Sequence, residues 1–195
     1  MIEKNNSEYL KDSVKNLISS GRMQHSLQTA ETAETLACKF GVSSEKAYRA
    51  GLLHDICRDI SFSEMKNWLE DSSWDADVWE KKIPNLLHAP ASAARAEREL
   101  GIHDLEVLQA IRYHATGYPD MDDLTSVVFL ADKIEPGRQY RGCGKIRREV
   151  ENGLKPALLS LCNRTLKYLI QEELPVHPRT FLLRNQLLEE RKINE

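Results

Sequence analysis

The sequence has little of several features that mark particular classes of protein. It contains only 9 Gly and 7 Pro among 195 residues, and they fall between periodic segments, which excludes collagen-like and disordered chains. No apolar run approaches the length of a membrane span, and the polar segment from Met1 to Tyr9 does not resemble a signal peptide. We therefore expect a cytoplasmic protein with no membrane partner.

Paired cysteines are also missing. The four cysteines are scattered and form no CxxC motif, which fits reduced thiols in a cytosol and excludes a zinc–thiolate site. We expect all four to be structural: Cys38, Cys57, Cys143 and Cys162.

An excess of positive charge is absent as well. Lys and Arg number 27 against 30 Asp and Glu, which gives a formal net charge of −3. Proteins that bind nucleic acids or membranes in general need a basic field, so we expect no nucleic-acid partner. An anionic ligand must then be bound by a local cluster of cations.

Helical periodicity dominates the chain, and no segment shows a convincing strand alternation, so we expect an all-α fold. We expect one domain over residues 1–195, with a core of about 20–150 and two C-terminal helices, about 155–193, that pack on it. The expected helices are 7–20, 24–40, 43–57, 62–71, 76–82, 89–100, 104–115, 122–135, 145–152, 155–173 and 178–193.

Three of these helices carry an inward-facing stripe, at i, i+3, i+4 and i+7, whose last member is a good metal ligand. Burying an ionised carboxylate requires a cation or hydrogen-bond donors beside it. The stripes are Ala47, Ala50, Gly51 and His54; Val107, Ala110, Ile111 and His114; and Thr125, Val128, Phe129 and Asp132.

Three further residues extend this set: His25, His88 and Asp55, which follows His54 directly. A single histidine on an apolar face is usually a hydrogen-bonded core residue, and we assign His103 and His177 to that class. Four histidines and two aspartates together instead predict a metal centre. Imidazole and carboxylate ligands suit iron, manganese, cobalt or zinc.

The segments around these residues resemble the HD-domain superfamily of metal-dependent phosphohydrolases, and in particular its YqeK family. The similarity spans about Arg22 to Leu188. It rests on Gln24-His25-Ser26-Leu27, Ala50-Gly51-Leu52-Leu53-His54-Asp55, Leu86-Leu87-His88-Ala89-Pro90, Ala110-Ile111-Arg112-Tyr113-His114-Ala115-Thr116-Gly117 and Phe129-Leu130-Ala131-Asp132-Lys133-Ile134-Glu135-Pro136-Gly137-Arg138.

The resemblance implies an HD-domain helical bundle with symmetrical bis(5′-nucleosyl)-tetraphosphatase activity. Such an enzyme splits diadenosine tetraphosphate, or a related dinucleoside polyphosphate, into two ADP, and it carries iron. The family's metal ligands match His25, His54, Asp55 and Asp132. His88 and His114 match positions that either contact the phosphates or hold a second metal, and the sequence leaves both options open.

The remaining site residues are expected to bind the nucleotide. Arg22 and Arg58 lie three residues from a ligand, and Lys133 and Arg138 follow Asp132 closely. Arg58 replaces a lysine that is usual in the family. We expect Asp55, Arg58, His88 and His114 to be catalytic. The nucleotide-binding set is Arg22, His25, Arg58, His88, His114, Asp132, Lys133 and Arg138, with Val176, His177 and Thr180 at the nucleobase.

Other functions on the same scaffold stay open at this point. They are an HD-type phosphohydrolase of another nucleotide, a di-iron oxygenase, and a non-catalytic sensor that binds a nucleoside diphosphate. ADP or GDP is the expected product-like ligand. The sequence does not decide the number of metal ions, the choice between adenine and guanine, or the oligomeric state, for which a homodimer is one option.

Overall fold

The computed structural model describes residues 7–193, and it places them in helices and loops without a strand. The all-α fold expected from the periodicity is therefore confirmed. Among the described residues, no helix is both long and apolar enough to cross a membrane. The helices are α1 (Ser7–Leu17), α2 (Ser20–Phe40), α3 (Ser44–Leu53), α4 (Phe62–Leu69), the 3-10 turn η1 (Glu80–Lys82), α5 (Pro84–Arg98), α6 (Leu105–Tyr113), α7 (Asp123–Ile134), α8 (Cys143–Glu149), the 3-10 turn η2 (Val150–Asn152), α9 (Leu154–Gln171) and α10 (Pro178–Ile193).

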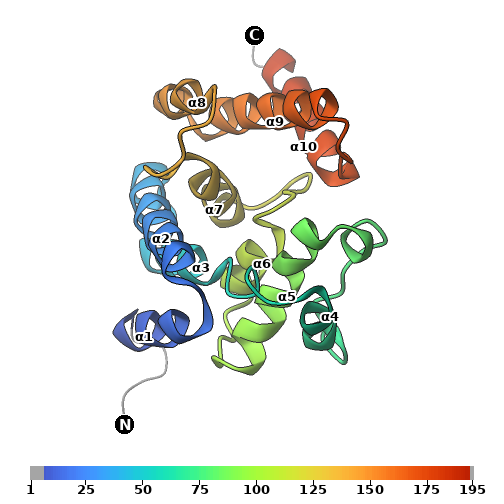
Figure 1. Cartoon of the computed structure of the whole chain (residues 1–195). Coiled ribbons are helices and arrows are strands. Elements are labelled where there is room, and N and C mark those ends of the chain that lie inside the picture. The colour runs from blue at the N-terminus through green and yellow to red at the C-terminus, as the bar shows by residue number, and fades with distance from the viewer. Residues whose placement is uncertain (1–6, 194–195) are drawn as a thin grey trace.

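Five helices form the inner bundle. The long helix α2 packs along α3 and α7, and α6 contacts α3, α5 and α7. The last three helices lie together at one end of the molecule, where α9 packs on α7 and is flanked by α8 and α10 (Figure 1). The two C-terminal helices thus pack on the bundle, as the sequence predicts.

Polar side chains define where the helices begin. Ser19 caps α2, Ser43 caps α3, and Ser61 forms a capping box with Glu64 at the start of α4. These side chains accept hydrogen bonds from amide groups of the first turn that have no partner within the helix. Gly41, in a left-handed conformation with φ of 72°, ends α2.

Several expected helices need correction. The segment 76–82 forms only the short turn η1, because the side chain of Asp77 accepts the amide groups of Trp79 and Glu80 in place of helical carbonyls. Helix α5 begins at Pro84 instead of residue 89, since proline is well suited to the first helical position. His88 therefore lies within the helix and not before it.

Helix α3 ends at Leu53 instead of residue 57, so His54 and Asp55 stand at a helix end and reach the same space. The expected helix 145–152 is likewise divided, into α8 and η2.

Gly51 allows α2 and α3 to lie unusually close together. A Cβ atom at this position would come within 2.8 Å of the Cα of Ala30 on α2. Real Cβ atoms do not approach backbone that closely, so a larger residue would push the two helices apart. Because α2 carries His25 and α3 leads into His54, this contact also sets the distance between two expected metal ligands.

Candidate metal centre

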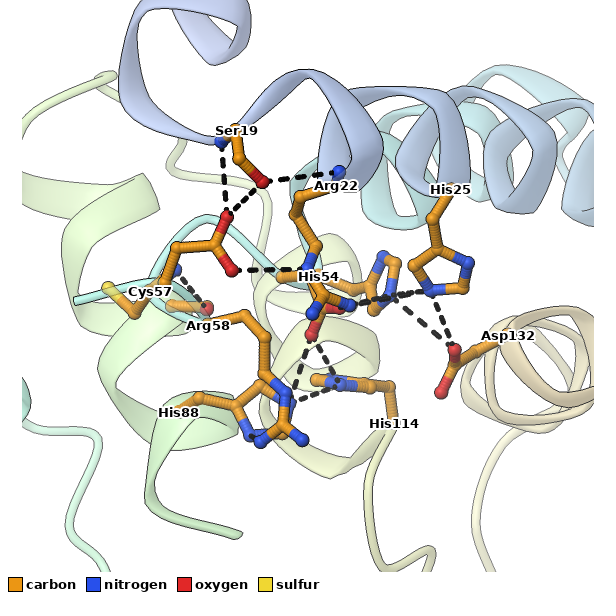
Figure 2. Close-up of polar contacts among 12 residues, drawn as sticks. Ser19, Arg22, His25, His54, Cys57, Arg58, His88, His114 and Asp132 are labelled. Carbon is orange, nitrogen blue, oxygen red and sulfur yellow. Dashed lines mark hydrogen bonds and ion pairs between the residues drawn. The ribbon is translucent and has the colours of Figure 1, made fainter. Parts of the chain in front are cut away.

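The six expected ligand residues meet in the middle of the bundle. The four histidines and Asp132 point toward one another, with Asp132 approaching from α7 (Figure 2). All are buried except His25, whose side chain is 11% exposed. They are His25 on α2, His54 and Asp55 after α3, His88 on α5, His114 after α6 and Asp132 on α7.

Two of the histidines are oriented by the same local structure. His54 and His114 are the C-cap residues of α3 and α6, and the Nδ1 of each lies 2.7 Å from a carbonyl oxygen three residues earlier, that of Gly51 and that of Ile111. Those carbonyls belong to the last turn, where a partner from outside the helix is needed. Because Nδ1 donates to the carbonyl, Nε2 presents its lone pair to the centre.

Four residues form the first group of potential ligands: His25, His54, Asp55 and Asp132. The Nε2 atoms of His25 and His54 are 3.2 Å apart, and Oδ1 of Asp132 is 3.0 Å from the first and 3.7 Å from the second. Oδ2 of Asp55 lies 3.5 Å from His54 Nε2 and 3.8 Å from His25 Nε2. Ligands bound about 2.1 Å from one ion are spaced by roughly 3–3.5 Å, so these atoms are close to coordination spacing.

The hydrogen bonds of His25 and His54 turn a lone pair of each ring toward the other. Nδ1 of His25 lies 3.2 Å from the buried carboxylate of Glu135, so its proton sits on that side. Two Nε2 lone pairs therefore face each other across 3.2 Å, next to two carboxylates. Arg138 donates to the Nε2 atom of His25 at 3.1 Å, and a proton or a metal ion between the two ring nitrogens would remove the repulsion that is left. Metal-bound histidines generally donate the hydrogen of their other ring nitrogen to a carboxylate or a carbonyl oxygen, as His25 and His54 do here.

The electrostatics of the centre favour a positive ion. Burial alone would lower the pKa of His54, but the charges of Asp55 and Asp132 raise it to about 10. Burial opposes ionisation of both carboxyl groups as well, yet the pKa of each is held well below its usual value, for Asp55 by His54 and for Asp132 by Lys133 and His25. Burial lowers the pKa of His114 to about 3, so this imidazole stays neutral at physiological pH.

Asp55 connects this first group to the other two histidines. Its Oδ1 atom lies 3.1 Å from His88 Nε2 and 3.6 Å from His114 Nε2, while those two ring nitrogens are 3.0 Å apart. His88 differs from the other three histidines, because its Nδ1 accepts from Arg58, 3.3 Å away. Its proton is then on Nε2, which makes His88 a donor toward the centre.

The four cations expected around the centre are all found there. Arg22 lies 2.8 Å from Asp55, Arg138 lies 2.7 Å from Asp132, and Lys133 lies 2.5 Å from the second oxygen of Asp132. Arg58 reaches His88 as described. Arg22 and Arg58 thus stand on the Asp55 side of the centre, and Lys133 and Arg138 on the Asp132 side.

The segment expected at the nucleobase makes contacts of another kind. His177 is buried, and its Nε2 lies 2.9 Å from Asp77. Thr180 donates to the carbonyl oxygen of Thr116 at 2.7 Å, which ties the start of α10 to the chain just after His114. Val176, which precedes them, is half-buried. None of these contacts involves the metal-centre residues, so the nucleobase role stays a prediction.

Two features of the structure were not predicted from the sequence. Glu135, which orients His25, lies three residues after Asp132, and its place on the same helical face was a usable signal. The second is a buried network in which Arg112 donates two bonds of 2.7 Å to Glu80, and Arg179 adds a third at 3.0 Å. Its members are 32 and 99 residues apart, so no local pattern indicates them.

Comparison with known proteins gives the same picture over most of the chain. Residues 22–137 match the HD domain family. A symmetrical bis(5′-nucleosyl)-tetraphosphatase from Halalkalibacterium halodurans is 37% identical over 179 residues, which cover 92% of this chain and 95% of that protein. The protein of the same name from Bacillus subtilis is 36% identical, over 90% of this chain and 94% of its own length.

A solved structure shows the same fold. It is a crystal structure from Clostridium acetobutylicum, described as a predicted HD superfamily hydrolase involved in NAD metabolism. It is 31% identical in sequence and superposes with a TM-score of 0.89, covering 95% of this chain and 98% of that one.

Proposed function

Because the chain belongs to the HD-domain family, and within it to the symmetrical bis(5′-nucleosyl)-tetraphosphatases, we propose that it hydrolyses diadenosine tetraphosphate and related dinucleoside polyphosphates to two ADP. The observation that carries the proposal is the buried group of four histidines and two aspartates with two cations on either side. A metal-dependent attack on a phosphate chain needs both the metal ligands and the cations that bind the phosphates.

We propose that His25, His54, Asp55 and Asp132 hold a divalent transition metal. Nitrogen and carboxylate ligands without a thiolate suit iron, which is our first choice, and also manganese, cobalt or zinc. Such an ion lowers the pKa of a bound water toward neutrality and draws electron density from a phosphoryl oxygen.

The cations on the two sides are proposed to bind the phosphate chain. Arg22 and Arg58 beside Asp55, and Lys133 and Arg138 beside Asp132, provide positive charge in both directions away from the centre. Phosphates bound on both sides leave an inner phosphorus over the metal ligands, which suits symmetric cleavage. The same cations stabilise the charge that develops in the transition state.

The protonation of the two remaining histidines supports separate roles. His88 carries its proton on Nε2, so we propose that it donates to the leaving diphosphate. His114 carries its proton on Nδ1 instead, so its Nε2 atom presents a lone pair near the first ligand group. We propose that His114 serves as an additional metal ligand and that His88 contacts phosphate.

The test is to load the purified protein with iron(II) or manganese(II) and incubate it with a panel of nucleotides. We expect ADP as the main product from diadenosine tetraphosphate, identified by ion-exchange chromatography. Equal amounts of AMP and ATP would place the attack on an outer phosphorus and contradict the proposed binding of the phosphates. Turnover of a different nucleotide would favour another HD phosphohydrolase, and tight ADP or GDP binding without turnover would favour a sensor.

Two finer expectations complete the proposal. Thr180 bonds to the carbonyl oxygen of Thr116, just after His114, which supports our placement of Thr180, with Val176 and His177 beside it in sequence, at the edge of the nucleotide site, where the nucleobase would be bound. A homodimer is the second expectation, and sedimentation of the purified protein tests it.

A further inference from the structure

A groove of about 780 Å³ is lined by residues of α8 and α9. These helices lie at the end of the molecule where the last three helices gather (Figure 1). Lining residues at every third or fourth position from Pro156 to Gln171 form one wall along a single face of α9. No residue of the metal centre lines it. Its volume falls within the range of about 300–1,000 Å³ that is typical of small-molecule sites.

The groove is strongly basic although the whole protein carries a net charge of −3. Five cations line it, against a single carboxylate, that of Glu149. Such a local excess attracts anions. The cations are Arg141, Lys145, Arg164, Lys167 and Arg191.

Three of these cations have no partner of their own. The exposed side chains of Arg141, Lys145 and Lys167 form no ion pair or hydrogen bond with any other residue between 7 and 193. The cations around the metal centre, in contrast, are all bonded to carboxylates or to a histidine. The unpaired cations are therefore available to a ligand, and the fold does not depend on them.

Arg164 is held in place by two aromatic rings. The centre of its guanidinium group lies 3.9 Å from the ring centroid of Tyr140 and 5.0 Å from that of Tyr168. Its side chain also packs near Gly142, whose positive φ of 98° forms the turn before α8. The groove thus contains one positioned charge, that of Arg164, beside the three unpaired cations. The Tyr168 side chain, 43% exposed, offers an aromatic surface.

We propose that this groove binds a nucleotide, with its phosphates among Arg141, Lys145 and Lys167 and its base against Tyr168. Aromatic rings beside arginine and lysine side chains are the combination that binds both parts of such a molecule. A mononucleotide fits the observations better than RNA, because the five cations that line the groove form one small group on a protein with a net charge of −3. This site is separate from the metal centre and does not depend on the reaction proposed there.

The experiment counts bound ADP by equilibrium dialysis. We expect two ADP per wild-type chain, one at the metal centre and one in the groove. The Lys145→Ala/Lys167→Ala variant should lose the groove site, with binding there weakened at least about tenfold. A matched variant at two exposed lysines elsewhere, Lys15→Ala/Lys82→Ala, should bind like the wild type. Unchanged binding by the groove variant would overturn the proposal.

Asp55→Ala separates this result from the function proposed above. If the metal centre binds no nucleotide, wild type and Asp55→Ala should both bind one ADP, and the groove variant none. Inorganic diphosphate should compete at the groove at least about tenfold less well than ADP, because it lacks a base to stack on Tyr168. Equal competition, or binding of a single-stranded oligoribonucleotide in place of ADP, would contradict a nucleotide site.

Discussion

At the scale of the single residue, the partner of each imidazole Nδ1 atom decides whether the Nε2 atom donates a hydrogen or presents a lone pair. Backbone carbonyls fix the tautomers of His54 and His114, whereas Arg58 imposes the opposite tautomer on His88. His114→Ala should therefore lower metal content or affinity. His88→Ala should keep its metal and lose turnover, by about 10²–10⁴-fold. Elemental analysis and steady-state kinetics on both variants test this; metal loss in His88→Ala alone would reverse the two roles.

A second prediction separates the metal ligands from the phosphate-binding cations. Asp55→Ala removes a carboxylate ligand, so metal content and turnover should fall together, with lower thermal stability. Arg58→Ala leaves every proposed ligand in place, and kcat/KM should drop by about 10–1000-fold with the metal retained.

The exposed Arg148 has no partner within residues 7–193 and provides the matched control for Arg58. Arg148→Ala should keep the wild-type rate. An Arg58→Ala enzyme with wild-type kcat/KM would exclude Arg58 from the site.

Much of the site could be predicted from residue spacing. His54, His114 and Asp132 each end a helical stripe, and the structure places all three in one buried group. Arg22 and Arg58 were located by their distance in sequence from a ligand. Which proton each histidine carries could not be predicted, because it depends on partners such as Glu135, which is 110 residues from His25.

At the scale of the helix, the contact between α2 and α3 sets the first ligand pair. Gly51→Ala would place a Cβ atom 2.8 Å from the Cα of Ala30. We expect a loss of about 1–3 kcal/mol of stability, as for other overpacked interiors, and weaker metal binding because His25 and His54 move apart.

Gly21→Ala, in α2, is the control, since nothing lies within 4 Å of its added Cβ atom. It should be neutral or more stable by about 0.5–1 kcal/mol, because alanine favours the helix. Thermal unfolding and metal content measured on both variants test the prediction. Equal values for Gly51→Ala and wild type would show that the helices adjust without cost.

The positions of the helices were predictable, and their ends less so. Stripes of apolar residues locate α3, α6 and α7 because a buried face must repeat with the helical period. Ends depend on single side chains. The Asp77 carboxylate limits the segment 76–82 to a short turn, and α5 begins early, at Pro84. The helical period of apolar residues carries no information on either end.

At the scale of the whole molecule, the Glu80 network joins parts of the chain that are far apart in sequence. Glu80 is fully buried, and Arg112 is 3% exposed. Glu80→Gln leaves the Arg112 charge buried without its counter-ion and should cost about 3–5 kcal/mol.

Lys39→Ala, which removes an ion pair whose side chains are 37% and 76% exposed, should cost less than about 1 kcal/mol. Urea denaturation of the two variants gives both values. Similar, small losses for both would contradict a stabilising role of the Glu80 charge.

The contacts at the start of α10 also have a consequence for synthesis on the ribosome. His177 bonds to Asp77, 100 residues earlier, and Thr180 bonds to Thr116, 64 residues earlier. A nascent chain that has emerged only to α9 already contains every metal ligand, but it lacks Arg179, the second cation on buried Glu80. The order of translation therefore supplies the ligands first and the segment that contacts the chain after His114 last, so we expect the centre to reach its final form only late in synthesis.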